Sequence, residues 1–337
     1  MKRSPQGCTA GHTANTPWFF LFFLGINCFA AQLPAVSNPP TVPGTIFQHL
    51  YELAPEALAI TLETDLKALE ENKDKEENKD KEAYQPAVLR YTGDDGQVIT
   101  WNIEVRPRGN SRRRVCDLPP LKLEFSDDEL SARRLDSDLD DLKLVSQCKG
   151  YKVNASYVMQ EYMAYRLYNE VTPYSLRVRL LEITFVDTGR KGKESEMSGF
   201  VIEEVEELAR RHEGKYLDHY DFFRAEELDR PAYLRMAVFQ YMIGNTDWAV
   251  HNLHNLKLIW VPDRENPIVV PYDFDLSGFV HTDYAIPNER LPINSVTERL
   301  YLGPRCTQSE VAAVLKDFRR LVPEFQRHCT SLEQLRK

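Results

Sequence analysis

A polar loop between an apolar helix and two short strands constrains the fold of this chain more than any other feature. The sequence predicts the helix over 232–243 and the strands over 256–260 and 267–271. The loop before the first strand presents Asp247 together with an Asn. Two further carboxylates, in the run Asp-Phe-Asp at 273–275, emerge where the second strand ends in a turn.

Metal-assisted phosphoryl transfer uses such residues, because it needs positioning and charge neutralisation more than covalent help. Asp247 is the candidate that orients or deprotonates the acceptor. An Asn and a second Asp would hold Mg²⁺ or Mn²⁺, which take oxygen ligands. Asn252 lies five residues after Asp247, as in protein kinases, and Asn255 lies eight after it. The metal-binding candidates are Asn252, Asn255, Asp273 and Asp275. The alternative is that these residues only form turns.

Three separated parts of the chain resemble the CotH-type (spore coat protein H-like) kinases, a branch of the protein-kinase-like fold. The run Arg-Gly-Asn-Ser at 108–111 and the segment 120–125 look like that family's loop and its lysine-bearing strand. The segment 198–204 is similar to the connection between the two lobes. Gly-Asn-Thr-Asp at 244–247 and Asp-Phe-Asp at 273–275 complete the set, which spans roughly half of the chain.

The resemblance implies an α+β, two-lobed protein-kinase-like fold, with a strand-rich N-lobe and a mostly helical C-lobe. It implies phosphoryl transfer from ATP to a protein hydroxyl with Mg²⁺ or Mn²⁺, on a protein substrate that the sequence does not name. Asn255 is the preferred metal-binding Asn, because it directly precedes a strand as in the family, and strand position favours Asp273 over Asp275. Many relatives carry a basic residue or His where this chain has Trp248-Ala249-Val250.

The same resemblance assigns the nucleotide contacts. Lys122 would reach phosphate from its strand, held by Glu161 of a helix predicted over 156–169. The alternatives are that Lys122 is an exposed lysine on an edge strand and that Glu161 is a charge on the surface of its helix. Glu203 is expected only to lie beside the segment whose backbone groups bind adenine. The full set of nucleotide-binding candidates is Arg108, Gly109, Asn110, Ser111, Lys122, Glu161 and Glu203.

Two other function classes remain open on this evidence. The chain could be a catalytically inactive protein of the cell envelope that binds a nucleotide or a partner. It could instead transfer AMP or an amino acid on the same fold. The scarcity of ATP outside the cytoplasm weighs against an exported ATP-dependent enzyme.

The N-terminus predicts export to the periplasm, the cell envelope or the medium. Residues 1–30 read as a signal peptide, with Lys2 and Arg3 before a short apolar run. An uncleaved anchor, or lipidation at Cys28, is the alternative and the only route to a membrane. Residues 31–44 read as a linker rich in Pro, Ala and Ser.

The rest of the chain divides into an N-lobe with the inter-lobe segment over 45–205 and a C-lobe over 206–337. The N-lobe is predicted to contain strands over 58–62, 85–91, 98–105 and 176–186, and a charged hairpin loop over 189–198. A perfect tandem repeat of a charged hexapeptide fills 71–82 and reads as a solvated insertion. Apolar residues at helical spacing predict helix in the tail, 309–335.

Composition excludes some partners. A formal net charge of -9 argues against nonspecific nucleic-acid binding, which needs an excess of Lys and Arg. The one dense basic run, 112–114, lies beside the Gly-containing loop, where it could meet nucleotide phosphates or an acidic substrate, or form a solvated turn.

Cysteines and histidines leave further alternatives. Signal cleavage would leave Cys116, Cys148, Cys306 and Cys329. These four form either two disulfides or four buried thiols. Pairing Cys116 with Cys148 and Cys306 with Cys329 would close short loops. No Cys-x-x-Cys pair supports zinc. His251 and His254 are either transition-metal ligands or loop histidines.

Overall fold

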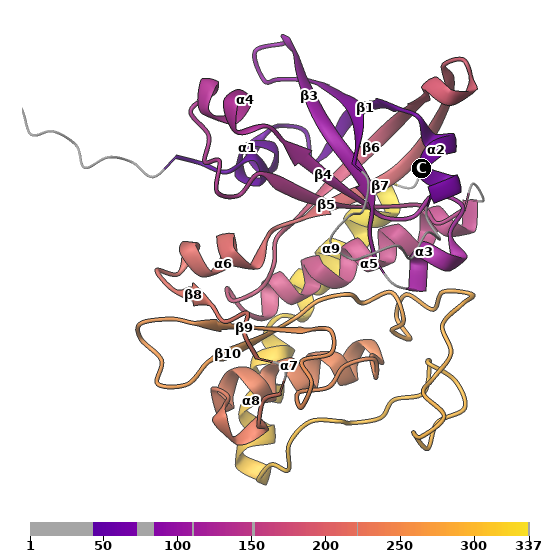
Figure 1. The fold of residues 1–337 in the computed structure, drawn as a ribbon. Coiled ribbons are helices and arrows are strands. Elements are labelled where there is room, and N and C mark those ends of the chain that lie inside the picture. The colour runs from indigo at the N-terminus through magenta and orange to yellow at the C-terminus, as the bar shows by residue number, and fades with distance from the viewer. Residues whose placement is uncertain (1–42, 73–83, 110, 150–151, 221, 336–337) are drawn as a thin grey trace, which may run out of the picture. The chain divides into compact units, whose positions relative to one another are not determined.

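The computed structural model describes residues 43–72, 84–109, 111–149, 152–220 and 222–335 (Figure 1). The predicted signal peptide, most of the linker and most of the charged repeat lie outside these residues. Within the described ranges, no helix is both long enough and apolar enough to cross a membrane.

The first part of the described chain is a closed barrel of seven strands, in the order β1-β2-β3-β4-β5-β7-β6 (Figure 1). Neighbouring strands pair antiparallel except β1 and β6, which pair in parallel from Ala57 with Leu180 to Thr64 with Asp187. This parallel pair closes the sheet. The strands are β1 (Ala57–Thr64), β2 (Gln85–Thr92), β3 (Val98–Pro107), β4 (Leu121–Phe125), β5 (Asp141–Ser146), β6 (Val178–Asp187) and β7 (Lys193–Ile202).

Alternating side chains make the barrel, because successive residues of a strand point to opposite faces. Along β1, Leu58, Ile60 and Leu62 are buried in the barrel core while the residues between them are more exposed. The strands predicted over 58–62, 85–91, 98–105 and 176–186 are therefore confirmed as β1, β2, β3 and β6. Each such apolar side chain, when fully buried, stabilises the folded protein by about 1.5–3 kcal/mol relative to leaving it exposed.

Two short helices add apolar side chains to the barrel core at the two ends of β1. Helix α1 (Ile46–Glu52) comes before β1, and its Thr45 cap accepts a hydrogen bond from the Gln48 N–H at 2.9 Å. Helix α2 (Leu66–Asn72) follows β1. The buried residues that these helices contribute to the barrel core are Ile46, Phe47, Leu50, Leu66 and Leu69.

The prediction of a charged hairpin loop over 189–198 is wrong for most of these residues. A short 3-10 turn, η1 (Thr188–Arg190), is followed at once by the ten-residue strand β7, which pairs with β6 as far as Asp187 with Lys193. The first half of β7 is exposed or only partly buried on both faces. Its charged residues therefore lack the alternation that marks a strand in sequence.

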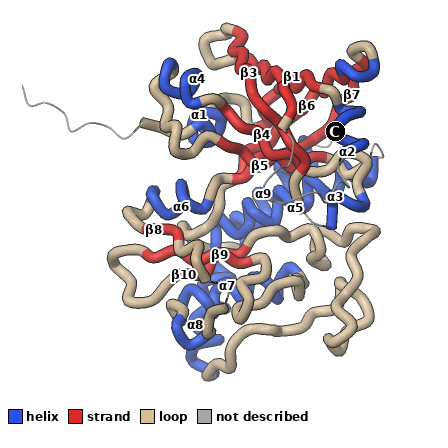
Figure 2. Tube along the Cα trace, in the orientation of Figure 1, coloured by secondary structure: helices blue, strands red, loops and turns tan. Residues whose placement is uncertain are grey.

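A second hydrophobic core surrounds the long helix α5 (Lys152–Val171), which begins earlier than predicted. It also contains α7 (Arg230–Ile243) and the three-stranded sheet β10-β9-β8. Figure 2 shows this small sheet, in red, apart from the barrel strands. The remaining elements of the chain are α3 (Ser111–Val115), α4 (Asp127–Ala132), α6 (Val205–Arg211), β8 (Lys215–Tyr216), η2 (Ala225–Glu227), β9 (Leu256–Trp260), β10 (Ile268–Pro271), α8 (Gln308–Arg320) and α9 (Val322–Leu335).

The two-lobed protein-kinase-like fold expected from the sequence is wrong. The strands form a closed barrel because β6 returns to pair in parallel with β1, and an open N-lobe sheet would leave those edges apart. The later half is not mostly helical either. Between β10 and α8, residues 272–307 form one long segment without a helix or strand, drawn in tan in Figure 2. The fold is a mixed α+β structure built on a barrel.

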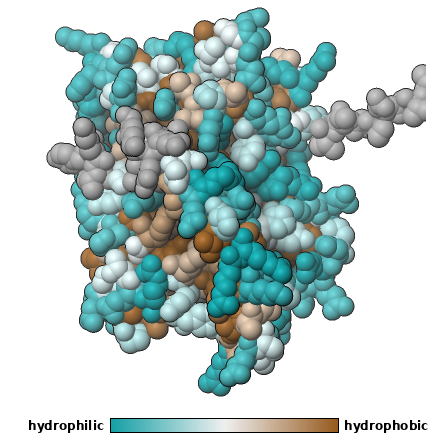
Figure 3. All heavy atoms as spheres, turned by 180° about the vertical axis from the view of Figure 1, so that it is seen from behind, coloured by the Kyte–Doolittle hydropathy of each residue, from teal (hydrophilic) through white to brown (hydrophobic). Residues whose placement is uncertain are grey.

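Apolar burial is concentrated inside these two cores. On the face drawn in Figure 3, hydrophobic residues appear in separate small groups among hydrophilic ones. Four large aromatic residues are fully buried: Trp101, Phe185, Phe200 and Phe274. The large aromatic side chains therefore stabilise the interior of the protein.

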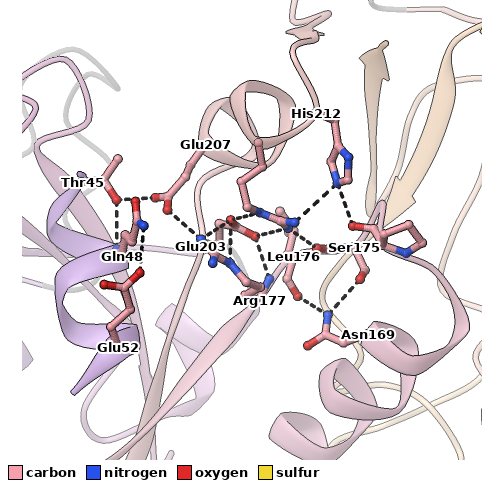
Figure 4. Close-up of polar contacts among 12 residues, drawn as sticks. Thr45, Gln48, Glu52, Asn169, Ser175, Leu176, Arg177, Glu203, Glu207 and His212 are labelled. Carbon is pink, nitrogen blue, oxygen red and sulfur yellow. Dashed lines mark hydrogen bonds and ion pairs between the residues drawn. The ribbon is translucent and has the colours of Figure 1, made fainter. Parts of the chain in front are cut away.

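A polar network joins α1 to the start of β6 and to α6 (Figure 4). The buried Glu203 carboxylate accepts hydrogen bonds from Arg177 and Arg211. Glu207 accepts from the Thr45 hydroxyl at 2.7 Å and from Arg177 at 2.9 Å. Burial raises the pKa of Glu207 to about 7, a change that its hydrogen bond to Thr45 opposes and the charge of Glu203 reinforces.

We expect Glu207 to make stability depend on pH. Its folded-state pKa of about 7 lies above the ordinary value of 4.5, so the folded state binds this proton more tightly than the unfolded state. This contribution, roughly 3 kcal/mol, is complete below about pH 4.5 and is lost as pH rises through 7, with about 2 kcal/mol of it lost between pH 5.5 and 8.5. Urea unfolding at pH 5.5 and 8.5 measures it. Glu207→Gln should flatten the dependence, and an unchanged slope in that variant would refute the assignment.

One disulfide joins Cys116 to Cys148, which are 32 residues apart in sequence. The first of the two expected short-loop pairings is therefore confirmed. Cys306 remains a thiol, so the expected second bridge to Cys329 is not formed. The Cys116–Cys148 bridge ties the segment after α3 to the end of β5.

Removing this bridge should lower the free energy of unfolding by about 3–4 kcal/mol, because the loop it closes becomes free in the unfolded chain. Urea unfolding of the Cys116→Ala/Cys148→Ala double variant measures the loss. Dithiothreitol should destabilise the wild type by a similar amount and leave the double variant unaffected. Cys306→Ser is the matched control and should keep the sensitivity to dithiothreitol. A wild type indifferent to reduction would contradict the pairing.

Candidate functional site

The polar loop over 244–255 begins where α7 ends. Gly244 closes the helix with a positive φ of 67°, which suits glycine because it has no Cβ. Asn245 is buried, and its Oδ1 accepts the Asp247 N–H at 2.9 Å. The Trp248 indole donates to the Asn245 carbonyl. The chain direction at Asp247 is therefore set by a buried asparagine.

The Asp247 carboxylate is held from two sides. The Asn255 amide nitrogen donates to Asp247 Oδ2 and to the Asp247 carbonyl, both at 2.8 Å. His254 Nε2 lies 2.9 Å from Asp247 Oδ1. Asn255 has a positive φ of 52°, which asparagine tolerates better than most residues. The structure therefore brings Asp247 together with the preferred metal-binding Asn.

Asn255 also connects this loop to the strand-end carboxylates. Its carbonyl accepts the Tyr272 N–H at 3.1 Å, one residue before Asp273. The link arises because β9 and β10 pair as a hairpin, with Leu256 opposite Pro271. The β9 and β10 strands confirm the predictions over 256–260 and 267–271.

Asp273 adopts a positive φ of 60°, and the Tyr165 hydroxyl accepts a hydrogen bond from its N–H at 2.9 Å. Strained backbone of this kind persists only where the surroundings hold it, and it is common at functional sites. Tyr165 comes from α5, so the long helix positions the turn that carries Asp273.

Arg112 of α3 gathers three carboxylates around one guanidinium. Its Nη2 lies 2.5 Å from Glu161 Oε2 and 3.6 Å from Asp273 Oδ1, and its Nε donates to Asp275 Oδ2 at 2.9 Å. Only 12% of the Arg112 side chain is exposed. The Tyr284 hydroxyl also donates to Asp275 Oδ2, at 3.0 Å. Charge-assisted hydrogen bonds in so buried a place are stronger than those at the surface.

The cluster holds more negative than positive charge. Burial, and then the charge of Asp275, raise the pKa of Asp273 well above its usual value. Burial opposes ionisation of Asp275 too, but Arg112 outweighs it and the Asp275 pKa is lowered. Burial raises the pKa of Glu161 to about 6 despite the pull of Arg112. The carboxylates therefore compete for a single guanidinium.

A cavity of about 50 Å³ lies beside the cluster. Arg108 and Gly109 border it from the barrel side, and Tyr272 and Asp273 from the hairpin side. Glu161 and Tyr165 of α5 line it as well. Three of the predicted nucleotide contacts (Arg108, Gly109 and Glu161) and two predicted metal ligands (Asp273 and Asp275) therefore share one small space.

Other predicted residues lie elsewhere. Lys122 is on the outward face of β4, and its Nζ lies 2.7 Å from Asp141 Oδ2. The expected contact with Glu161 is not formed among the described side chains, because Arg112 occupies the place beside that carboxylate. Glu203 is engaged by two arginines as described above. Asn252 is exposed in a turn.

The other two members of the Arg-Gly-Asn-Ser run follow Gly109. Asn110 lies outside the described residues. Ser111 is the first residue of α3. Arg108 and Gly109 are therefore the members of that run that border the cavity.

The two loop histidines do not form a metal site. Among the described residues, no group of three or more His, Cys, Asp or Glu is arranged to hold a metal ion. His254 pairs with Asp247, while His251 is exposed and its carbonyl accepts the Phe223 N–H. The expected ligands for Mg²⁺ or Mn²⁺ are carboxylates together with an Asn oxygen. The two hydrogen bonds from the Asn255 side chain to Asp247 use only its amide nitrogen and not its carboxamide oxygen.

Asp273, Asp275 and the Asn255 side chain carry the oxygen atoms expected to bind a divalent cation. Burial and the charge of Asp275 raise the pKa of Asp273, so a further positive charge beside this carboxyl would favour its ionised form. Hard cations favour such carboxylate and carboxamide oxygens.

Comparison with known proteins adds no relative to this picture. No protein-family model matches the sequence, and a search of curated proteins found no match.

Sequence reasoning missed the central role of Arg112. It placed the arginine run 112–114 near phosphates or solvent, whereas Arg112 pairs with the buried Glu161 and Asp275 and lies near the half-exposed Asp273. The available signal was charge balance, since buried carboxylates must be paired. Tyr165 and Tyr284 were also missed, because tyrosines at helical or loop positions look like ordinary packing residues.

Replacing Arg112 should destabilise the protein strongly. Arg112→Met leaves Glu161 and Asp275 buried without their cation, at a cost of about 3–5 kcal/mol in the free energy of unfolding. Urea unfolding at neutral pH measures this loss. Arg319→Met, an exposed arginine of α8, is the control and should change stability by less than about 0.5 kcal/mol. Equal effects of the two variants would contradict the ion-pair assignment.

Proposed function

We propose that this chain transfers a phosphoryl group from ATP to a hydroxyl of a protein substrate. The observation that carries the proposal is the double role of Asn255. Its side chain holds Asp247, and its carbonyl accepts the N–H of Tyr272 beside Asp273. One residue thus links the acid that would orient the acceptor to the acid that would bind a metal. The resemblance to CotH-type kinases in the same segments supports the same chemistry.

The protein's own residues would act mainly by position and charge. Asn255 and His254 fix the Asp247 carboxylate, so one of its oxygens can accept the proton of an incoming hydroxyl. Arg108 borders the cavity and could meet phosphate oxygens with its guanidinium. Arg112 keeps Asp275 ionised in a place where burial would otherwise neutralise it.

Asp273, Asp275 and the Asn255 carboxamide oxygen would hold Mg²⁺ or Mn²⁺. When bound, the cation neutralises phosphate charge and aligns the transferring group. The raised pKa of Asp273 supports this assignment, because a cation could take the place of the proton that the paired carboxylates favour.

A second candidate function is favoured by the size of the cavity. At about 50 Å³ it is far smaller than the 300–1,000 Å³ of typical ligand sites. Arg112 also occupies the position beside Glu161 that the family resemblance gives to a phosphate-contacting lysine. Both observations favour a catalytically inactive protein that binds a partner or a nucleotide without transferring a group.

We also propose that the protein is exported to the periplasm or cell envelope. The Cys116–Cys148 disulfide supports this location, because such bonds persist mainly in oxidising compartments.

Saturating ATP with Mg²⁺ or Mn²⁺ should raise the melting temperature by roughly 5 °C at a hundredfold excess over Kd, because the ligand binds only the folded state. Differential scanning fluorimetry measures the shift. Asp273→Asn should abolish it by removing a metal ligand. Asp247→Asn should keep it, since that residue acts on the acceptor.

Asp263→Asn, an exposed acid in the turn between β9 and β10, is the matched control and should behave as the wild type. The absence of a shift with any nucleotide would exclude the phosphoryl-transfer proposal. Labelled ATP then separates the remaining chemistries. Transfer of the γ-label supports a kinase and transfer of the α-label supports transfer of AMP, whereas binding without either supports the inactive protein.

A further inference from the structure

A second, larger cavity lies away from the candidate phosphoryl-transfer site. It measures about 390 Å³, within the range of small-molecule sites. Its walls come from the segment 51–56, from α5, from the start of β6 and from α9. None of its lining residues borders the small cavity beside Asp273. The two spaces are therefore distinct.

Arg179 of β6 is an unusual residue for its place. It precedes Leu181 by two, so strand alternation puts it on the face that carries Leu181 and Ile183 into the barrel core. Only 6% of Arg179 is exposed. A buried guanidinium is costly unless its charge is compensated.

The compensation of Arg179 is incomplete. Its Nη2 donates to the carbonyls of Leu53 and Pro55. The Nε–H is buried and has no hydrogen-bond partner. None of the ion pairs in the described part of the chain includes Arg179. Burial lowers its pKa, as expected of a cation without an adjacent carboxylate.

Further basic side chains line the same cavity. Arg166 of α5 and Arg327 of α9 face it, and so does the buried His328. The Arg327 Nε donates to Glu324 Oε2 at 2.8 Å in an exposed pair, and 59% of the Arg327 side chain is accessible, so its other nitrogens can turn toward a ligand. This wall therefore joins one deep guanidinium to an adaptable one.

The acids at the cavity are already engaged. Glu56 accepts from Arg166 Nη1 at 3.0 Å, and Glu52 accepts from the Gln48 amide at 2.8 Å, as Figure 4 shows. Glu170 is 2.7 Å from His328 Nε2 and 3.6 Å from Arg327 Nη2. Glu56 is the carboxylate at the cavity whose charge acts on Arg179, and it is paired with Arg166, so no acid of the described residues forms an ion pair with Arg179 at the inner end.

We propose that this cavity binds a small organic anion, with its phosphate or carboxylate group held by Arg179 and Arg327. Guanidinium groups bind both anions through paired N–H donors. The volume suits a molecule with a few heavy atoms beyond the anionic group, and Leu53, Pro55 and Val178 supply apolar lining for that part. This site does not depend on the proposed phosphoryl transfer.

Isothermal titration of the full chain with inorganic phosphate and with citrate, at constant ionic strength, tests the site. The wild type should bind at least one probe saturably. Arg327→Ala should weaken that binding at least about tenfold, because it removes a charge-assisted hydrogen bond. Arg320→Ala, an exposed arginine of α8 outside the cavity, is the matched control and should bind as the wild type.

Arg179→Lys keeps the positive charge but loses the paired N–H donors of the guanidinium, so this variant should also bind the anion more weakly. If that variant does not fold, because Arg179 also holds two carbonyls, Arg327→Ala alone decides the result. Arg108→Ala reports binding at the other site. Absence of binding to the wild type overturns the proposal. So does binding that survives Arg327→Ala or that is lost only in Arg108→Ala.

Discussion

The Arg112 guanidinium joins three parts of the protein that are far apart in sequence. It comes from the short helix after β3, and it binds Glu161 of α5 and Asp275 after β10, partners 49 and 163 residues away. This one side chain ties the barrel to the second core and neutralises the acids of the candidate site. The stability of that junction and the charge of the site therefore depend on the same interaction.

The barrel supplies the rigid support for this junction. Parallel pairing of β1 with β6 closes the sheet, and the Cys116–Cys148 bridge fastens the segment after α3 to the end of β5. The loop that carries Arg108 and Arg112 therefore starts and ends on fixed strands. Sites built on such supports hold their side chains more precisely than free loops do.

Sequence alone predicts the local features well. Strand-forming runs, a turn sequence and, in β6, alternation identified β1, β2, β3 and β6. The nearness of Asp247 to Asn255 follows from their separation of eight residues. It failed where long-range pairing decides the outcome. The closure of β1 on β6 links residues more than a hundred apart, and no local pattern distinguishes a closed barrel from an open sheet. The partner of Glu161 was likewise misassigned to Lys122, because both basic residues lie near the same Gly-containing loop and only the folded chain selects Arg112.

The central claim is that Asp273 and Asn255 bind a metal beside a nucleotide. Crystals grown with Mn²⁺ and a non-hydrolysable ATP analogue test it most directly, because anomalous scattering locates the metal without reference to a mechanism. The account predicts one manganese peak within coordination distance of the Asp273 carboxylate and the Asn255 carboxamide oxygen, with phosphate density toward Arg108. Manganese elsewhere, or an unoccupied site with the Arg112 ion pairs unchanged, would contradict it.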